Sequence, residues 1–160
     1  IPNFESVLAA ATALAQVAVQ LDVPIIFTEH CVDKVGPTEP TLRDIAPDAP
    51  CLHKTHFGTL AEPDHRKTFA KLHGRRPIVC GTETHVCVLQ TVFGFIQNGF
   101  SPLLATDACG SRKSIDKDTA IARMTAAGTD VVTAEMVIFE WLRRADSDQF
   151  RQALPIIKGI

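Results

Sequence analysis

One cysteine stands where its thiol could act as a nucleophile. Residues 78–80 form a short apolar run typical of a strand, residues 81–83 form a polar turn, and Cys87 follows in the first turn of a helix expected over residues 84–98. A helix amino terminus favours the thiolate, which is the form of cysteine that attacks electrophiles. The pattern indicates a nucleophile, although a lone cysteine on an apolar helix is also commonly a small buried hydrophobe.

Lys54 is the second residue that could take part in chemistry. It belongs to a short extended segment expected over residues 51–57, where it is flanked by His53 and His56. A lysine in such a place is normally a solvated surface charge, so a catalytic role requires a partner residue elsewhere in the chain. The histidines show neither HxxxH nor HxH spacing. The spacing along the chain therefore predicts no metal site.

The elements that must position these residues alternate between helix and strand. The spacing of apolar residues predicts helices at residues 3–21 (with Asn3 as N-cap), 62–72, 84–98, 114–127, 135–144 and 148–154, and strands at residues 23–28, 51–57, 77–80, 102–106 and 131–133. Such alternation predicts a three-layer α/β/α fold with a mostly parallel sheet, because right-handed crossovers place helices on both faces.

The composition limits the size and the setting of this fold. With 160 residues, of which 46% are hydrophobic, the chain fits a single domain spanning residues 1–160. The net charge is −2 and no basic cluster is interleaved with aromatic residues, so nucleic acid is not an expected partner. No apolar run approaches the roughly 20 residues of a membrane span. Five cysteines without CxxC pairing fit a reducing, cytoplasmic compartment better than a disulfide framework.

Two segments are predicted to lie at a functional or intermolecular surface. Residues 29–50 contain four prolines and one glycine, which indicates a long ordered excursion of the kind that is usually functional. The helix expected over residues 84–98 is apolar on nearly all sides. Such a helix is buried within a molecule or in an oligomer interface, so we expect a homo-oligomer.

Together these motifs resemble the isochorismatase-like cysteine hydrolases, a family that includes nicotinamidases and N-carbamoylsarcosine amidases. The likeness spans nearly the whole chain. It is carried by residues 79–87, by residues 103–112 with Asp107-Ala108 and Ser111-Arg112, and by residues 54–57. Within the family, Thr28-Glu29-His30, Gly36-Pro37-Thr38 and residues 81–87 are similar to a branch of isochorismatase-domain proteins whose substrate is mostly unassigned.

The resemblance implies a catalytic triad of cysteine, lysine and aspartate. Cys87 matches the nucleophile and Lys54 matches the lysine. The family's aspartate ends a central first strand that precedes the first helix, whereas this sequence starts at or just before that helix. We therefore expect the strand and the aspartate within about 20 residues upstream of Ile1, since a strand and a turn need about that length. Without the aspartate we expect little activity.

The reaction implied by the resemblance is acyl transfer. The cysteine attacks a small amide-like or related carbonyl compound, and water then hydrolyses the acyl-enzyme. The family's oxyanion hole consists of backbone N–H groups that match those of Cys87 and Glu83. Its turn contains a cis peptide bond, which matches the bond between Thr82 and Glu83. No cofactor is implied.

The family's substrate pocket is the expected environment of three further residues. His30, His56 and Phe57 are predicted to line it. Nicotinamidases carry an Asp-x-His metal pair where this chain has Glu29-His30-Cys31-Val32. This departure from the pattern argues against a metal and against nicotinamidase activity.

Several interpretations stay open on the sequence alone. Arg112 either clamps a substrate carboxylate or pairs with Asp107 or Asp116, and Asp107 is expected to accept a cap or loop hydrogen bond. The alternative to a hydrolase is a non-enzymatic oligomeric scaffold or binding protein on the same fold. A redox-active thiol is a third hypothesis, but the chain offers no resolving cysteine at a defined spacing.

Overall fold

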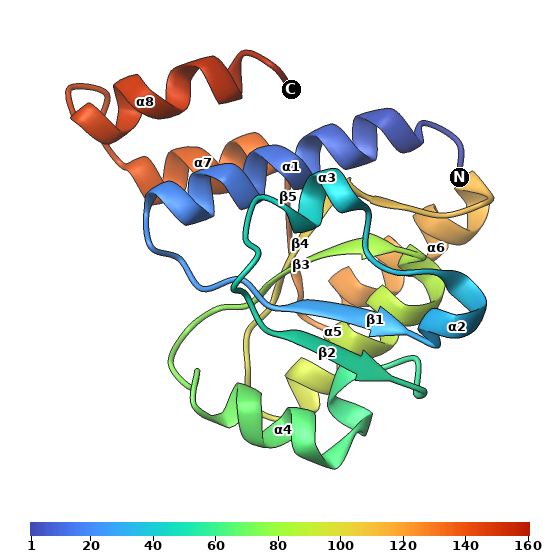
Figure 1. Cartoon of the computed structure of the whole chain (residues 1–160). Helices are drawn as coiled ribbons and strands as arrows, with labels where there is room; N and C mark the ends of the chain where they lie inside the picture. Colours follow the sequence, from blue (N-terminus) through green and yellow to red (C-terminus); the bar gives the residue numbers. More distant parts are fainter.

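Helices and parallel strands alternate along the computed structural model, which describes residues 1–160 (Figure 1). The helices are α1 (Phe4–Gln20), α2 (Val32–Val35), α3 (Pro40–Arg43), α4 (Pro63–Ala70), α5 (Leu89–Gln97), α6 (Ser114–Ala126), α7 (Ala134–Leu142) and α8 (Asp148–Ile157). The strands are β1 (Phe27–His30), β2 (Cys51–Lys54), β3 (Ile78–Thr82), β4 (Leu103–Gly110) and β5 (Asp130–Val132). Two short turns complete the elements, the 3-10 turn η1 (Thr59–Ala61) and the π-helical turn η2 (Thr84–Val88). None of the helices combines the length and the apolar character needed to cross a bilayer.

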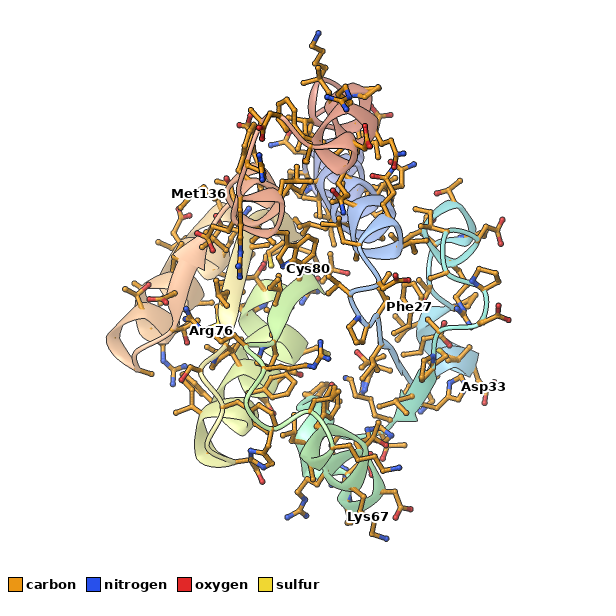
Figure 2. The ribbon with its side chains drawn as sticks, turned by 90° about the vertical axis from the view of Figure 1, so that its left-hand side faces the viewer. Phe27, Asp33, Lys67, Arg76, Cys80 and Met136 are labelled. Atoms are coloured by element: carbon orange, nitrogen blue, oxygen red, sulfur yellow. The ribbon has the colours of Figure 1, made fainter.

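The strands are arranged in two parallel sheets. β1 pairs with β2, and β3, β4 and β5 form a second sheet in that order. β1 and β3 are each paired on one edge only. Figure 2 shows Phe27 on β1 and Cys80 on β3 in the two separate sheets. The parallel pairing confirms the predicted α/β class, although the strands do not form one continuous sheet.

β4 has a helical layer on each face. Leu103 and Ala105 join a core formed with α1, α7 and α8, whereas Leu104 joins a second core formed with α5 and α6. All three residues are buried, as expected for a strand covered on both faces. Figure 1 shows α1, α7 and α8 together on one side of the strands and α5 and α6 on the other.

Some element boundaries differ from the sequence prediction. Asn3 does not cap α1 with its side chain, because it adopts a left-handed conformation with φ of 58°. β1 starts at Phe27 and not at residue 23, since the N–H of Val23 donates to the carbonyl of Ala18 at the end of α1 (2.8 Å). Val23 is therefore still hydrogen-bonded to the end of α1, and the chain enters the sheet only at Phe27.

The proline-rich excursion after β1 is tethered by a buried carboxylate. Oε1 of Glu29 accepts hydrogen bonds from the Thr38 backbone N–H (2.8 Å) and from its hydroxyl (2.7 Å). These bonds, above all the backbone one, hold the pKa of Glu29 below its usual range. The excursion, which contains α2 and α3, is thus fixed to the end of the first strand.

Replacing Glu29 by glutamine should remove a pH-dependent part of the stability. Because the folded-state pKa of Glu29 is lowered, its carboxylate stabilises the fold above the unfolded-state pKa of about 4.3 and loses this effect as the pH falls through the folded value. We expect the difference in Tm between wild type and Glu29→Gln to be largest near neutral pH and to shrink below about pH 4. Thermal unfolding followed by circular dichroism measures it. Glu39→Gln, on the exposed surface of the same excursion, is the matched control. A difference that is constant with pH would contradict the prediction.

Candidate active site

The predicted site residues lie at the carboxyl ends of the parallel strands. His30 ends β1, Lys54 ends β2, and Thr82 ends β3 immediately before Glu83 and the turn that carries Cys87. His30 and Lys54 are register partners, so their side chains leave the same face of the β1–β2 pair. In α/β folds, ligands bind outside the carboxyl ends of the strands. Each of these residues therefore lies at the kind of strand end where a ligand site is expected, His30 and Lys54 in one sheet and Thr82 in the other.

The turn between β3 and α5 carries Cys87. Cys87 lies in η2 and is half-buried, neither sealed in the core nor fully exposed. The Thr82–Glu83 peptide bond is cis. The Glu83 carbonyl accepts hydrogen bonds from the N–H groups of Val86 (3.1 Å) and Val88 (3.2 Å). π-helical turns occur frequently at functional sites, and this one leads directly into α5.

Side chains from η2 hold the turn against the end of β4. The buried Thr84 hydroxyl donates to the Gly110 carbonyl (3.0 Å). Nδ1 of His85 lies 3.0 Å from the Ser111 hydroxyl. Both contacts join residues two or three positions before Cys87 to the carboxyl end of the neighbouring strand. The position of the cysteine is thus fixed by two strands.

Arg112 has a different partner from those that the sequence suggested. Its Nε lies 2.7 Å from Oε1 of Glu83, and it forms no ion pair with Asp107 or Asp116. Oε2 of Glu83 is buried and has no hydrogen-bond partner, with Nε2 of His85 at 3.4 Å. Arg112 and His85 therefore orient the residue that was expected to supply an oxyanion donor. Nothing in the local spacing of the sequence indicates this pair.

Asp107 accepts the cap hydrogen bonds that the sequence predicted. The N–H of Ala134 lies 2.9 Å from its Oδ1 and 3.1 Å from its Oδ2. Ala134 is the first residue of α7, so the carboxylate satisfies a free N–H group at the start of that helix. The contact links β4 to α7.

Lys54 is a buried cation without a carboxylate partner. Its side chain is 5% exposed, and Nζ donates to the carbonyls of Phe57 (2.7 Å) and His56 (3.2 Å). None of the ion pairs of the chain includes Lys54. Buried charges are normally paired, and an ammonium has three donors, so one N–H is left for another group.

The loop that holds Lys54 packs directly on the helix that follows Cys87. The Thr59 N–H donates to the Thr91 hydroxyl (3.1 Å), and the two hydroxyls lie 3.2 Å apart. A Cβ placed on Gly58 would lie 3.0 Å from the carbonyl oxygen of Gln90. The residues after Lys54 therefore contact the first turn of α5, just beyond the cysteine.

The three residues expected in a substrate pocket have different surroundings. The rings of His30 and Phe57 lie with centroids 5.0 Å apart, and Nδ1 of His30 is buried without a hydrogen-bond partner. His56 lies on the surface, where its Nδ1 is 2.9 Å from Oε1 of Glu62. That hydrogen bond, followed by those from the backbone N–H groups of Thr55 and His56, lowers the pKa of Glu62 to about 2. Nδ1 of His30, at the end of β1, is thus without a hydrogen-bond partner, whereas Nδ1 of His56 is hydrogen-bonded to Glu62.

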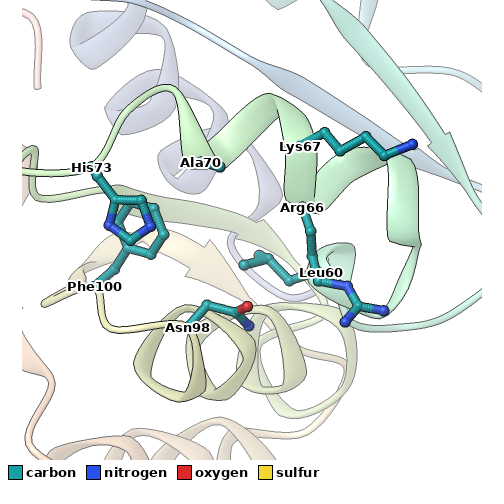
Figure 3. Close-up of a pocket in the computed structure, with 7 residues that line it drawn as sticks. All are labelled: Leu60, Arg66, Lys67, Ala70, His73, Asn98 and Phe100. Atoms are coloured by element: carbon teal, nitrogen blue, oxygen red, sulfur yellow. The ribbon is translucent and has the colours of Figure 1, made fainter.

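A hollow of about 280 Å³ lies between α4 and α5, away from these residues (Figure 3). His73 stacks on Phe100 at one end of it, with ring centroids 4.6 Å apart. Arg66 and Lys67 approach it from α4. None of the predicted site residues lines this pocket.

Comparison of the sequence with known proteins identifies the family of this chain. The isochorismatase domain family matches residues 1–136. Isochorismatase domain-containing protein 2A of Mus musculus is 34% identical over 164 residues, covering 99% of this chain and 75% of the relative.

Solved structures share the same fold. The MAR1 ribonuclease of Caenorhabditis elegans is 30% identical with a TM-score of 0.91, covering 99% of this chain and 81% of the other. YcaC of Escherichia coli, described as an octameric hydrolase of unknown specificity, is 26% identical with a TM-score of 0.88, covering 98% and 80%. Nicotinamidase PncA of Bacillus subtilis, at 14% identity and a TM-score of 0.69 over 80% and 84%, shares the fold alone. On the match of its sequence and its fold, the chain belongs to the isochorismatase family.

Proposed function

We propose that this protein is a hydrolase that uses Cys87 as a nucleophile to cleave a small amide-like or related carbonyl compound through an acyl-enzyme. The observation that carries the proposal is Lys54, a buried cation with a free donor whose loop packs on the helix behind Cys87. In the proposed site the Lys54 ammonium lies beside the Cys87 sulfur, where a cation favours the thiolate over the thiol. Membership of a family with hydrolase relatives supports the proposal.

In the proposed reaction the Cys87 sulfur attacks the carbonyl carbon. The new S–C bond forms as the carbonyl π electrons move to oxygen, and the oxyanion accepts hydrogen bonds from the N–H groups of Cys87 and Glu83. No backbone hydrogen bond outside the helices and strands uses the Glu83 N–H. This donor is therefore available to a substrate.

The second half of the reaction restores the thiol. Collapse of the tetrahedral intermediate expels the amine or related leaving group, which takes up a proton. Water then adds to the thioester carbonyl, and the carboxylic acid leaves as the sulfur departs from carbon. The aspartate of the family's triad is the proposed acceptor of the thiol proton, and Lys54 holds the thiolate.

Selective alkylation tests the reactivity of the thiol without knowledge of the substrate. With limiting iodoacetamide at neutral pH and peptide mapping by mass spectrometry, we expect Cys87 to be labelled before Cys31. Both cysteines are half-buried, so exposure alone would give no preference between them. Labelling of Cys31 first would contradict an activated thiol at Cys87.

Hydrolysis itself is tested with the protein in its natural length and a panel of small primary amides and esters. We expect turnover that Cys87→Ala abolishes and that Cys31→Ala leaves unchanged. Retention of turnover in Cys87→Ala would exclude the cysteine mechanism. An RNA oligonucleotide belongs in the panel because one structural relative is called a ribonuclease, and we expect it to remain intact.

The alternative function is an oligomeric scaffold without catalysis. Met136 and Phe139 on α7 are 48% and 46% exposed, which favours a contact between subunits. A homo-oligomer fits the hydrolase equally well, since the YcaC relative is described as octameric. A stable oligomer in light scattering, combined with no preference for Cys87 in the alkylation experiment, would favour the scaffold.

A further inference from the structure

Three side chains with metal-binding atoms meet on one face of the β1–β2 pair. Glu29 and His53 are register partners, and Cys51 precedes His53 by two positions on β2, so all three leave the same face. A carboxylate oxygen, a thiol sulfur and an imidazole nitrogen lie within 4.8 Å of one another. His30 and Lys54, the next register pair, leave the opposite face. The cluster is thus separate from the proposed catalytic residues.

The spacing of two of these atoms already suits a tetrahedral ion. Oε2 of Glu29 lies 3.4 Å from Nδ1 of His53. Two oxygen or nitrogen ligands that are each bound to zinc at about 2.0–2.1 Å are roughly 3.3 Å apart in a tetrahedral site. The Cys51 sulfur, which lies within 4.8 Å of both atoms, would have to approach to a zinc–sulfur distance of about 2.3 Å.

Two hydrogen bonds from Thr38 hold the Glu29 carboxylate in place. Thr38 donates both of its hydrogen bonds to Oε1 of Glu29, which leaves Oε2 for an ion. Outer hydrogen bonds of this kind orient the ligands of metal sites. The His53 side chain is 68% exposed, so an ion and a water ligand reach the cluster from solvent.

We propose that Glu29, Cys51 and His53 bind one zinc ion, with a water molecule as the fourth ligand. Binding converts the Cys51 thiol to a zinc-bound thiolate and releases its proton to solvent, while the neutral imidazole and the carboxylate bind without a change of charge. Carboxylate, imidazole and thiolate are all ligands that zinc accepts. The set is not evident along the chain, because only the pairing of β1 with β2 brings Glu29 beside the other two residues.

The surrounding charges set the conditions for binding. Burial, followed by the charge of Glu29, raises the pKa of the Cys51 thiol, so zinc must displace a proton at neutral pH and its affinity should increase with pH. The Arg43 charge acts in the opposite direction and lowers the pKa of the Cys51 thiol. The Arg43 guanidinium donates to the Ala46 and Pro47 carbonyls and lies over the Phe27 ring, 4.9 Å from the centroid. These contacts direct the cation toward groups outside the cluster.

Cobalt(II) titration of chelator-treated protein tests the site, since a cobalt thiolate absorbs in the near ultraviolet. We expect one cobalt per chain with this absorption, displaced by equimolar zinc. Cys51→Ser should abolish the thiolate band, and His53→Ala should weaken binding by more than about tenfold. The controls Cys31→Ser and Cys87→Ser should retain the wild-type titration.

His53→Ala keeps the test decisive if Cys51→Ser does not fold, because the His53 side chain is largely solvent-exposed. The proposal is overturned if the stripped protein binds no cobalt, if His53→Ala binds it as tightly as wild type, or if the thiolate band disappears in Cys87→Ser and not in Cys51→Ser. Zinc should also raise the Tm of wild type but not of His53→Ala. None of these outcomes depends on hydrolysis.

Discussion

Replacing Lys54 by methionine should slow the alkylation of Cys87 at neutral pH by about tenfold or more. The proposed function places the Lys54 ammonium beside the Cys87 sulfur, and a positive charge within about 4–6 Å of an acidic group favours its ionised form by roughly one to three powers of ten. Methionine keeps the length and volume of the side chain but removes the charge, so it separates the electrostatic role of Lys54 from packing. Pseudo-first-order labelling of Cys87, followed by mass spectrometry, gives the rate. With a hydrolysable substrate, we expect turnover to fall by about 100-fold or more.

The matched control is Lys67→Met on α4, where the ammonium is 79% exposed and paired with Asp64. It should leave the labelling rate unchanged. Because Lys54→Met also leaves the carbonyls of His56 and Phe57 without their donor, circular dichroism must show that the variant is folded. A folded variant in which Cys87 reacts at the wild-type rate would contradict the role of Lys54.

Replacing Gly58 by alanine should destabilise the loop that holds Lys54 and slow the same reaction. The added methyl group would lie 3.0 Å from the Gln90 carbonyl oxygen, a contact with backbone that cannot rotate away. Overpacking of this kind costs about 1–3 kcal/mol, which equilibrium unfolding in urea measures. As the loop moves away from α5, the hydrogen bond between Lys54 and the Phe57 carbonyl should lengthen and the labelling of Cys87 should slow.

Gly94→Ala provides a control on the other side of the same interface. Its methyl group would meet the Leu60 side chain at 3.2 Å, and alanine at this helical position gains up to about 1 kcal/mol over glycine. We therefore expect a smaller net loss than for Gly58→Ala. Equal or greater destabilisation by Gly94→Ala would show that the Gly58 contact is not tight.

The order of elements could be predicted from the sequence because it follows from local patterns. The spacing of apolar residues along α1 and the short apolar run of β3 are both visible in the local sequence. The parallel pairing then follows from the alternation of helix and strand. Asn3 shows the limit of local rules, since its type suits a cap but its backbone adopts another conformation.

The contacts that position the site depend on residues far apart in the sequence. Arg112 reaches Glu83 because β3 and β4 are neighbours, and Thr59 meets Thr91 because a loop packs on α5. No spacing along the chain encodes these distances. Cys87 was indicated by its position after β3, but Lys54 stood out only through the resemblance to a family. The structure adds that Lys54 is buried without a carboxylate.

The division into two sheets has a consequence for the behaviour of this chain in solution. β1 and β3 each present one edge on which backbone N–H and C=O groups have no strand partner. Such edges are templates on which another extended chain can add. For these 160 residues on their own, we therefore expect losses of soluble protein that grow steeply with concentration, and a precipitate enriched in intermolecular β-structure.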